Sequence, residues 1–496
     1  MKRVRLSVII IMIGTLLSKV LGLLRDVILA SSFGATAVSD AYLISTTIPS
    51  LIVGAVATAI LSTYIPVLNS ALKESEEKAQ EFNDNAIFLS IVLVTVIVGI
   101  FFLFPDFIVS LFVIGFSDDN LNLVINMTKI TVFMSYFLIL ISIFSGYLQN
   151  KNKFRATSFN GIIFNTVSII GIILSARHNV YIMAFTFVLG YLLATLHLFR
   201  QCWKNGMRIK FRFDIRNPYI KKLVILTIPV VFNSMVWDVN VMIDKTLTST
   251  IGAGYISGLN YSYKIINVAI DIFAVSIATF IFPKLSRAFH EQNTSILQNT
   301  LKNSVNLILL LLIPVMFIII AFSPLIVQIL FMRGSFDEFA LNITSNSLKL
   351  YALLLSFTGI NTIIYKFYNA LELNKIPAIN ALISIVLNII LNLAFIGPLG
   401  YRGIILATVL STCFASIMIL FKLRKHIEFS VYKNWLLNCL RAFASSAVSI
   451  VIATAAFNIH FVNSVIVNLA ISCVIFLIIY VFMLLLFRLK IKEIVI

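Results

Sequence analysis

Ser18–Asp26, read SKVLGLLRD, lies in the first apolar segment of the chain and carries three charged residues, Lys19, Arg25 and Asp26. A charge near the middle of a membrane costs at least about 2.5–3.5 kcal/mol, so such residues face a bundle interior or a watery cavity. Helical periodicity places Lys19 and Asp26 one heptad apart, with Arg25 beside them, on one broad face. This face predicts a cationic site for an anionic substrate. A structural Arg–Asp pair that only orders the bundle is the alternative.

The composition of the whole chain is that of a membrane protein. Its 496 residues are 60% hydrophobic and 12% charged, with a mean hydropathy of +1.02, whereas soluble domains are about 25% charged. Apolar runs long enough to span a bilayer recur from end to end, without the alternating segments of an outer-membrane barrel. We therefore predict an all-α polytopic membrane protein. Arg25-Asp26 interrupts the N-terminal apolar run, which we interpret as a retained first helix and not as a signal peptide.

Turn signals and apolar lengths predict about fourteen transmembrane helices. The expected spans are about 6–30, 40–69, 85–104, 121–148, 157–176, 179–200, 222–248, 254–284, 302–322, 343–369, 376–397, 401–422, 435–457 and 463–487. A basic connector at 201–221 is expected to separate an N-lobe of six helices, 1–200, from a six-helix C-lobe, 222–425. Residues 426–496 then supply two further helices.

We interpret the formal net charge of +18 as a signal of membrane orientation, because Lys and Arg are dispersed among the short loops between the predicted helices. Nucleic acid is therefore not an expected partner. With a cytoplasmic N-terminus, nearly all loop cations fall inside, and the outside loops keep Arg177, Lys245, Arg333 and Arg402. This asymmetry predicts that both termini are cytoplasmic.

The sequence also repeats itself. Asp26 with Phe33-Gly34 recurs as Asp244 with Ile251-Gly252, and ATAILSTYIPVL recurs as VSIATFIFPKL. The offset is about 220 residues, or six helices, so both copies start on the same side of the membrane. A parallel two-lobe repeat predicts a transporter that binds its substrate between the lobes.

Sequence signals for enzymatic chemistry are absent. The five histidines and four cysteines are dispersed without metal or disulfide spacing, and no phosphate-binding loop or nucleophile motif occurs. We therefore expect a gradient-driven transporter and not an enzyme. A membrane glycosyltransferase or polymerase would need catalytic carboxylates at a membrane face. Lys264, within NYSYKIIN, is the second-lobe candidate for binding an anion, and snorkelling to an interface is its alternative explanation.

Four stretches together carry a family resemblance: SKVLGLLRDVILASSFG, SDAYLISTTIPSLI with IPVL, LFMRGSFD, and NIILNLAFIGPLGYRGIILAT. They resemble the MurJ/MviN lipid II flippase family of the multidrug/oligosaccharidyl-lipid/polysaccharide exporter superfamily, over essentially the whole chain. The resemblance implies flipping of lipid II, a lipid-linked disaccharide-pentapeptide diphosphate, across the bacterial cytoplasmic membrane for cell wall synthesis. It also implies membrane lipids and the cell-wall synthesis machinery as partners. A flippase for another undecaprenyl-diphosphate-linked saccharide is the alternative, followed by a MATE-like small-molecule exporter.

The same resemblance implies a set of substrate-binding residues. Arg25 and Asp26 match an essential pair of the family's first helix, and Asp40 matches its acid at the start of helix 2. Lys19 and Lys264 stand where many members have Arg, so the charge is kept while bidentate phosphate geometry is lost. Val53 occupies a position that is a functionally important Arg in many members, which leaves the carried saccharide open.

A coupling monovalent cation such as Na⁺ is the last implication of the resemblance. Its ligands would be Asp238, Asn388, Asn392, Thr408 and the carbonyl of Ile404. Asn388 and Asn392 share one helix face, and their oxygens suit a hard cation. Interhelical hydrogen bonds explain these amides as well. Residues 426–496 resemble the family's groove for a long prenyl tail.

Overall fold

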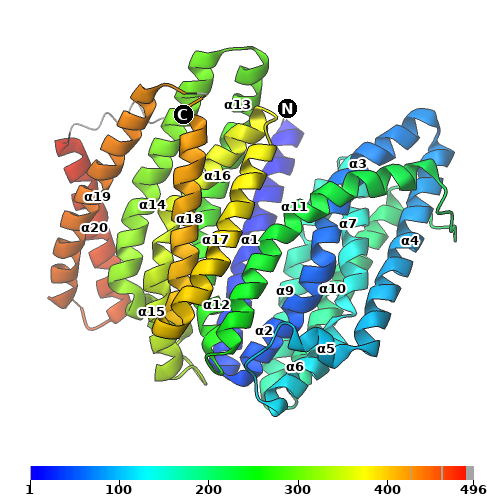
Figure 1. Ribbon diagram of the computed structural model, residues 1–496, viewed down its shortest axis with the longest axis horizontal. Helices are drawn as coiled ribbons and strands as arrows, with labels where there is room; N and C mark the ends of the chain where they lie inside the picture. Colours follow the sequence, from blue (N-terminus) through cyan, green and yellow to red (C-terminus); the bar gives the residue numbers. More distant parts are fainter. Residues whose placement is uncertain (1, 426, 460–461, 488–496) are drawn as a thin grey trace. The chain divides into compact units, whose positions relative to one another are not determined.

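The computed structural model describes residues 2–425, 427–459 and 462–487, and within these ranges every regular element is a helix (Figure 1). The predicted all-α class is therefore confirmed. The first half of the chain forms α1 (Lys2–Phe33), α2 (Ala37–Pro49), η1 (Ser50–Gly54), α3 (Ala55–Glu74), α4 (Glu76–Leu103), α5 (Pro105–Ser110), α6 (Asp118–Thr131), α7 (Met134–Asn150), α8 (Phe154–Ser158), α9 (Asn160–Arg177), α10 (Tyr181–Lys204) and α11 (Pro218–Ser249). The second half forms α12 (Tyr255–Ile270), η2 (Asp271–Val275), α13 (Ser276–His290), α14 (Thr294–Phe331), α15 (Glu338–Ala352), α16 (Leu354–Ala370), α17 (Lys375–Leu399), α18 (Tyr401–Leu423), α19 (Phe429–Asn458) and α20 (Val465–Leu486).

The described part of the chain holds 11 helical segments long and apolar enough to cross a membrane. The bent pair α15 and α16, with an angle of 45° between them, gives up to 12. The two other predicted spans, 6–30 and 222–248, fall on α1 and α11. Every predicted span thus falls mainly on helical residues, in five cases on two or three consecutive helical elements, while the number fourteen stays a prediction.

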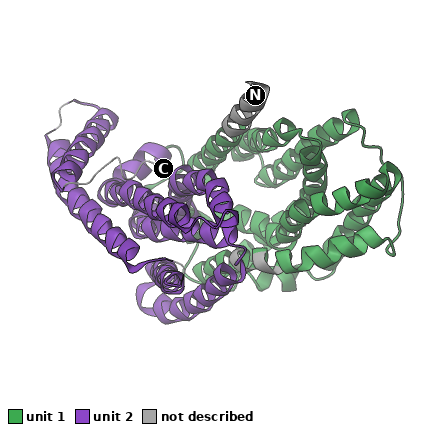
Figure 2. Ribbon diagram, turned by 90° about the horizontal axis from the view of Figure 1, so that it is seen from above, with its two compact units in different colours: residues 1–257, 333–337 green, residues 258–332, 338–496 purple. Residues whose placement is uncertain are grey.

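Contacts divide the chain into two compact units, drawn green and purple in Figure 2. Unit 1 comprises residues 1–257 and 333–337, and unit 2 comprises 258–332 and 338–496. The division falls after Ser257 and not at the basic connector, because α11 packs along α3 and α4 inside unit 1.

The connector itself is held against α4. The backbone N–H of Lys210 donates to Asp84 Oδ1 at 3.1 Å, and that of Asp214 donates to Asn85 Oδ1 at 2.7 Å. Asp84 and Asn85 are buried, so these two bonds satisfy polar groups that would otherwise be desolvated without partners. Residues 201–217 are therefore an ordered part of unit 1.

Both copies of the internal repeat contain a π-helical turn at the corresponding place. In unit 1, η1 follows Pro49 and joins α2 to α3, and in the second copy η2 joins α12 to α13. Pro49 lacks a backbone N–H and disturbs the regular ladder, as its mid-span position predicts. Because π-turns are rare and occur mostly at functional sites, their recurrence supports the parallel repeat.

The last two helices belong to unit 2 and attach to α14. Trp435 Nε1 of α19 donates to the carbonyl of Lys302 at 3.1 Å, and the Tyr480 hydroxyl of α20 donates to the carbonyl of Leu310 at 2.8 Å. These two bonds fix the helices predicted for residues 426–496 along one side of α14.

Candidate functional site

Arg25 and Asp26 form an ion pair on α1. Nε and Nη2 of Arg25 lie 3.2 and 3.0 Å from the same oxygen, Asp26 Oδ1. The two side chains are 17% and 3% exposed. Neighbouring residues on a helix do not normally face each other, so the arginine bends back to reach the carboxylate. The pair keeps a charge inside a membrane helix, as the sequence predicts.

Aromatic rings of unit 1 enclose the guanidinium. Its central carbon lies 5.6 Å from the centroid of the Phe164 ring, within cation–π range. Phe164 contacts Phe187 and Tyr191 with centroids 5.0 and 4.4 Å apart, and Phe187 contacts Tyr42 at 5.8 Å. The Tyr42 hydroxyl is buried and has no hydrogen-bond partner among the described residues. This aromatic enclosure, comprising these four rings, limits the directions in which Arg25 can point.

Asp40 has a structural environment that its sequence position did not indicate. The carboxylate is fully buried, and its two oxygens accept hydrogen bonds from the backbone N–H groups of Gly254 and Ser257, at 2.6 and 2.7 Å. Those groups belong to the start of α12, where helical N–H groups lack partners and a negative charge is favourable. Asp40 therefore caps a helix, with both oxygens engaged.

Lys245 is the residue of this region that sequence reasoning missed. The charge count places it with the outside loop cations, although the predicted span 222–248 contains it. It lies in α11, half-buried, and its Nζ donates to Thr47 Oγ1 of α2 at 2.6 Å. Asp26 and Asp40 both act on its charge electrostatically. A signal was present: Asp244-Lys245 repeats the charged dipeptide Arg25-Asp26 in reverse order.

The other predicted substrate residues are placed differently. Lys19 is exposed on α1, and Lys264 is half-buried on the part of α12 that belongs to unit 2. Unit 1 thus brings together Arg25, Asp26 and Asp40 with Lys245. Whether Lys19 and Lys264 bind substrate stays a prediction.

Val53 lies in apolar surroundings. It is fully buried in η1 and lines a cavity of about 180 Å³ with Pro49, Ile97, Ile100 and Phe101. The valine that departs from the family pattern is therefore matched to its mostly apolar neighbours, among which Ser135 is the polar residue and none is acidic.

Four of the five candidate cation ligands form a hydrogen-bonded cluster between α17 and α18. Asn392 Nδ2 donates to Asn388 Oδ1 at 2.9 Å, Asn388 Nδ2 donates to Thr408 Oγ1 at 3.2 Å, and Thr408 Oγ1 donates to the Ile404 carbonyl at 3.1 Å. Asn388 and Asn392 are buried in unit 2, whereas Asp238 is half-buried on α11 in unit 1. The atoms of this cluster that could coordinate a metal ion are all oxygens, which fits a hard cation. Among the residues that the structure describes, no three His, Cys, Asp or Glu side chains group as metal ligands.

The chain is similar to known proteins both in sequence and in fold. The sequence profile described as "Lipid II flippase MurJ" matches residues 29–487. The "Probable lipid II flippase MurJ" of Vibrio cholerae is 28% identical over 425 residues, which cover 83% of this chain and 81% of the relative. That of Thermotoga maritima is 26% identical over 425 residues, covering 85% and 86%.

Solved structures agree with these matches. "Lipid II flippase MurJ, inward closed conformation" superposes with a TM-score of 0.85 at 26% identity, covering 97% of this chain and 99% of that one. An inward-facing MATE transporter of the MOP superfamily, 13% identical with a TM-score of 0.71, shares the fold and covers 84% and 96%. Since the profile matches nearly the whole chain and the relatives match along most of their own length, this chain belongs to the lipid II flippase MurJ family.

Proposed function

We propose that this protein flips lipid II across the bacterial cytoplasmic membrane by alternating access. Family membership supports the reaction, and one observation of the site supports its chemistry: a guanidinium on α1 that is 17% exposed and held inside an aromatic enclosure. Diphosphate is an anion that planar Arg donors bind well, more strongly where water is excluded.

Arg25 is oriented for this role by Asp26. Two of its N–H groups bond a single carboxylate oxygen, while a guanidinium has five N–H donors. The remaining donors can therefore bind a phosphate oxygen without breaking the pair. Asp26 in turn keeps the arginine from pairing randomly with other groups, so little side-chain entropy is lost when substrate arrives.

A depletion experiment tests the substrate. Depleting the protein in cells that lack other lipid II flippases should accumulate cytoplasm-facing lipid II and stop wall synthesis. Normal wall synthesis with loss of a surface polysaccharide would instead identify another undecaprenyl-diphosphate-linked saccharide, the alternative that the apolar surroundings of Val53 keep open. Binding of defined lipid-linked substrates to the purified protein would distinguish lipid II from another saccharide directly. Formation of a glycan product in that mixture would show an enzyme and contradict the proposal of a transporter.

We propose further that a monovalent cation such as Na⁺ is bound by Asn388, Asn392, Thr408 and the Ile404 carbonyl, with Asp238 supplying charge. The buried oxygen cluster of α17 and α18 supports the first four. Asn392→Ala should raise the Na⁺ concentration needed for half-maximal transport. Asn380→Ala is the matched control, because Asn380 is an equally buried amide of α17 that bonds Tyr365 and the Ala415 carbonyl outside the cluster. Equal Na⁺ dependence in both variants would contradict the site.

The proposed orientation has cytoplasmic termini and a cytoplasmic connector. The dispersion of Lys and Arg supports it. In a variant without Cys202, Cys413, Cys439 and Cys473, a cysteine replacing Asn205 should react with impermeant thiol reagents only after the cells are opened. A cysteine replacing His178 should react in intact cells. The opposite labelling pattern would mean that the chain has the inverted orientation.

Residues 426–496 are proposed to hold the prenyl tail.

A further inference from the structure

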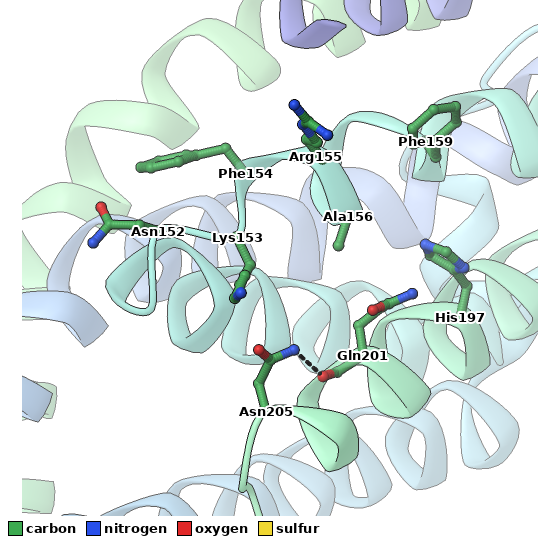
Figure 3. Close-up of a pocket in the computed structure, with 9 residues that line it drawn as sticks. All are labelled: Asn152, Lys153, Phe154, Arg155, Ala156, Phe159, His197, Gln201 and Asn205. Atoms are coloured by element: carbon green, nitrogen blue, oxygen red, sulfur yellow. Dashed lines mark hydrogen bonds between the residues drawn. The ribbon is translucent and has the colours of Figure 1, made fainter. Parts of the chain in front are cut away.

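A cavity of about 490 Å³ lies in unit 1, at the end of α7 and the end of α10 (Figure 3). The turn between α7 and α8 and the short helix α8 form one wall, and the last turns of α10 form the other. It shares no lining residue with the Arg25 enclosure. The transport chemistry described above therefore does not explain it.

The turn that carries Lys153 into this cavity is fixed by backbone hydrogen bonds. Asn152 adopts a left-handed conformation with φ 59°, its N–H donates to the Gln149 carbonyl at 2.9 Å, and the N–H of Lys153 donates to the Leu148 carbonyl at 2.7 Å. This arrangement ends α7 as in a Schellman motif. Figure 3 shows the lysine side chain extending from this turn toward Gln201 and Asn205.

The second repeat contains the same turn with different chemistry. At the end of α16, Glu372 has φ 61°, and the N–H of Leu373 donates to the Tyr368 carbonyl at 3.0 Å. Leu371-Glu372-Leu373 thus stands where unit 1 has Lys151-Asn152-Lys153. The turn geometry does not require lysine, so the positive charge at this place in unit 1 reflects either the bias of loop cations toward the cytoplasmic side or a ligand of the cavity.

The wall formed by α10 supplies polar groups at intervals of one turn. His197, Gln201 and Asn205 lie on one helix face. Asn205 Nδ2 donates to the Gln201 carbonyl at 2.7 Å, which orients its amide (Figure 3). His197 Nε2 is buried without a hydrogen-bond partner within the described ranges. A buried polar atom left in this way is destabilising, and a bound ligand or water would supply the missing hydrogen bond.

The charge of the cavity selects for an anion. Of its nine lining residues, Lys153 and Arg155 are cationic and none is acidic. Phe154 and Phe159 flank Arg155 and are 40% and 43% exposed, as aromatic side chains commonly are at a membrane–water interface (Figure 3). Lys153 and the amides inside, with Arg155 and the aromatic rings at the edge, suit an amphiphile whose polar head is a phosphate.

We propose that this cavity binds the phosphate headgroup of an anionic phospholipid of the surrounding bilayer. Basic pockets between transmembrane helices on the cytoplasmic side characteristically hold such headgroups. The proposal rests on the cytoplasmic placement of this end given under the proposed function. Lys153 and Gln201 donate to the phosphate oxygens, His197 Nε2 gains a partner, and Arg155 adds charge at the edge.

The test compares two charge-neutralised pairs in the full-length protein, reconstituted in phosphatidylcholine nanodiscs containing a minor fraction of phosphatidylglycerol. Lys153→Gln with Arg155→Gln should reduce retained phosphatidylglycerol, counted by native mass spectrometry, by about 25-fold, since each of the two cations contributes roughly a fivefold factor. Arg200→Gln with Lys204→Gln is the matched control, because both residues are exposed on α10 and neither lines the cavity. The control should retain lipid to within about twofold.

Three results would overturn the proposal. If both double variants lose phosphatidylglycerol equally, the lipid is held by diffuse attraction to the basic surface. If the Lys153/Arg155 double variant retains as much phosphatidylglycerol as the wild type, the cavity is not a binding site. Inorganic phosphate that raises the unfolding temperature of the wild type in pure phosphatidylcholine, but not that of the cavity pair, would assign a free-phosphate site instead. Lys153→Leu, which copies Leu373 of the second repeat, gives a second variant whose turn the fold already accommodates. No lipid II is present, so failure here is distinct from failure of the proposed transport.

Discussion

Arg25 can be a binding group, a structural group or both, and two substitutions separate these roles. We expect Arg25→Ala to abolish transport and Arg25→Lys to retain little of it, because an ammonium group cannot reproduce the planar donors that face Asp26 Oδ1 and a phosphate. Growth complementation at matched protein levels measures the effect. Full complementation by Arg25→Ala would leave only the structural role.

Lys245 should matter through its charge. It lies half-buried near two acids and bonds Thr47, so Lys245→Met leaves Asp26, Asp40 and the Thr47 hydroxyl without this partner and should destabilise the protein by about 1–3 kcal/mol. Lys222→Met is the matched control, since Lys222 is also on α11 and bonds the Ser70 hydroxyl at 2.8 Å, but is exposed. Thermal unfolding in detergent measures both, and equal shifts would show that the acids near Lys245 are unimportant.

At the scale of helices, the packing of α3 on α7 depends on a glycine. A Cβ on Gly146 would come 2.6 Å from the ring of Tyr64, a fully buried side chain whose hydroxyl bonds Asn83. Gly146→Ala should therefore lower stability by about 1–3 kcal/mol through overpacking. Gly99→Ala in α4 meets no atom within 4 Å and should leave stability unchanged or slightly raised. A thermal unfolding series compares them, and tolerance of Gly146→Ala would mean that the ring moves aside freely.

At the scale of the whole molecule, the last turn of α1 is hydrogen-bonded to the loop 333–337. The N–H of Ser335 donates to the Ser31 carbonyl at 2.8 Å, and its hydroxyl donates to the Ser32 carbonyl at 3.1 Å. Gly34 and Gly334, both with positive φ, permit this close approach. In the chain, this loop joins α14 to α15 of unit 2, so we expect alternating access to separate it from α1.

A disulfide tests this separation. In a background without native cysteines, Ser31→Cys with Ser335→Cys should cross-link under oxidation and stop transport, and a reductant should restore it. Ser31→Cys alone is the control and should transport under both conditions. Undiminished transport by the fully cross-linked protein would mean that this contact persists throughout the cycle.

The sequence by itself determined the membrane class, the positions of the helices and the internal repeat. These depend on local quantities: the length of each apolar run, the turn residues between runs, and the recurrence of whole segments such as those around Asp26 and Asp244. It also identified Arg25 and Asp26, because a charge inside an apolar run is visible without any partner. Their pairing through a single oxygen then agreed with the structural alternative as well as the functional one.

Only the tertiary structure decided what surrounds each polar group. Asp40 as a substrate-binding residue stays a prediction, and the structure adds that both its oxygens bond N–H groups more than two hundred residues later, at the start of α12. Lys245 was counted with the outside loop cations, yet it reaches Thr47 on α2, because α11 packs into unit 1. Lys153 resembled an ordinary loop cation until α10 brought His197 and Gln201 opposite it. Local patterns record how a helix begins and ends, whereas hydrogen bonds between distant segments depend on packing that no single segment encodes.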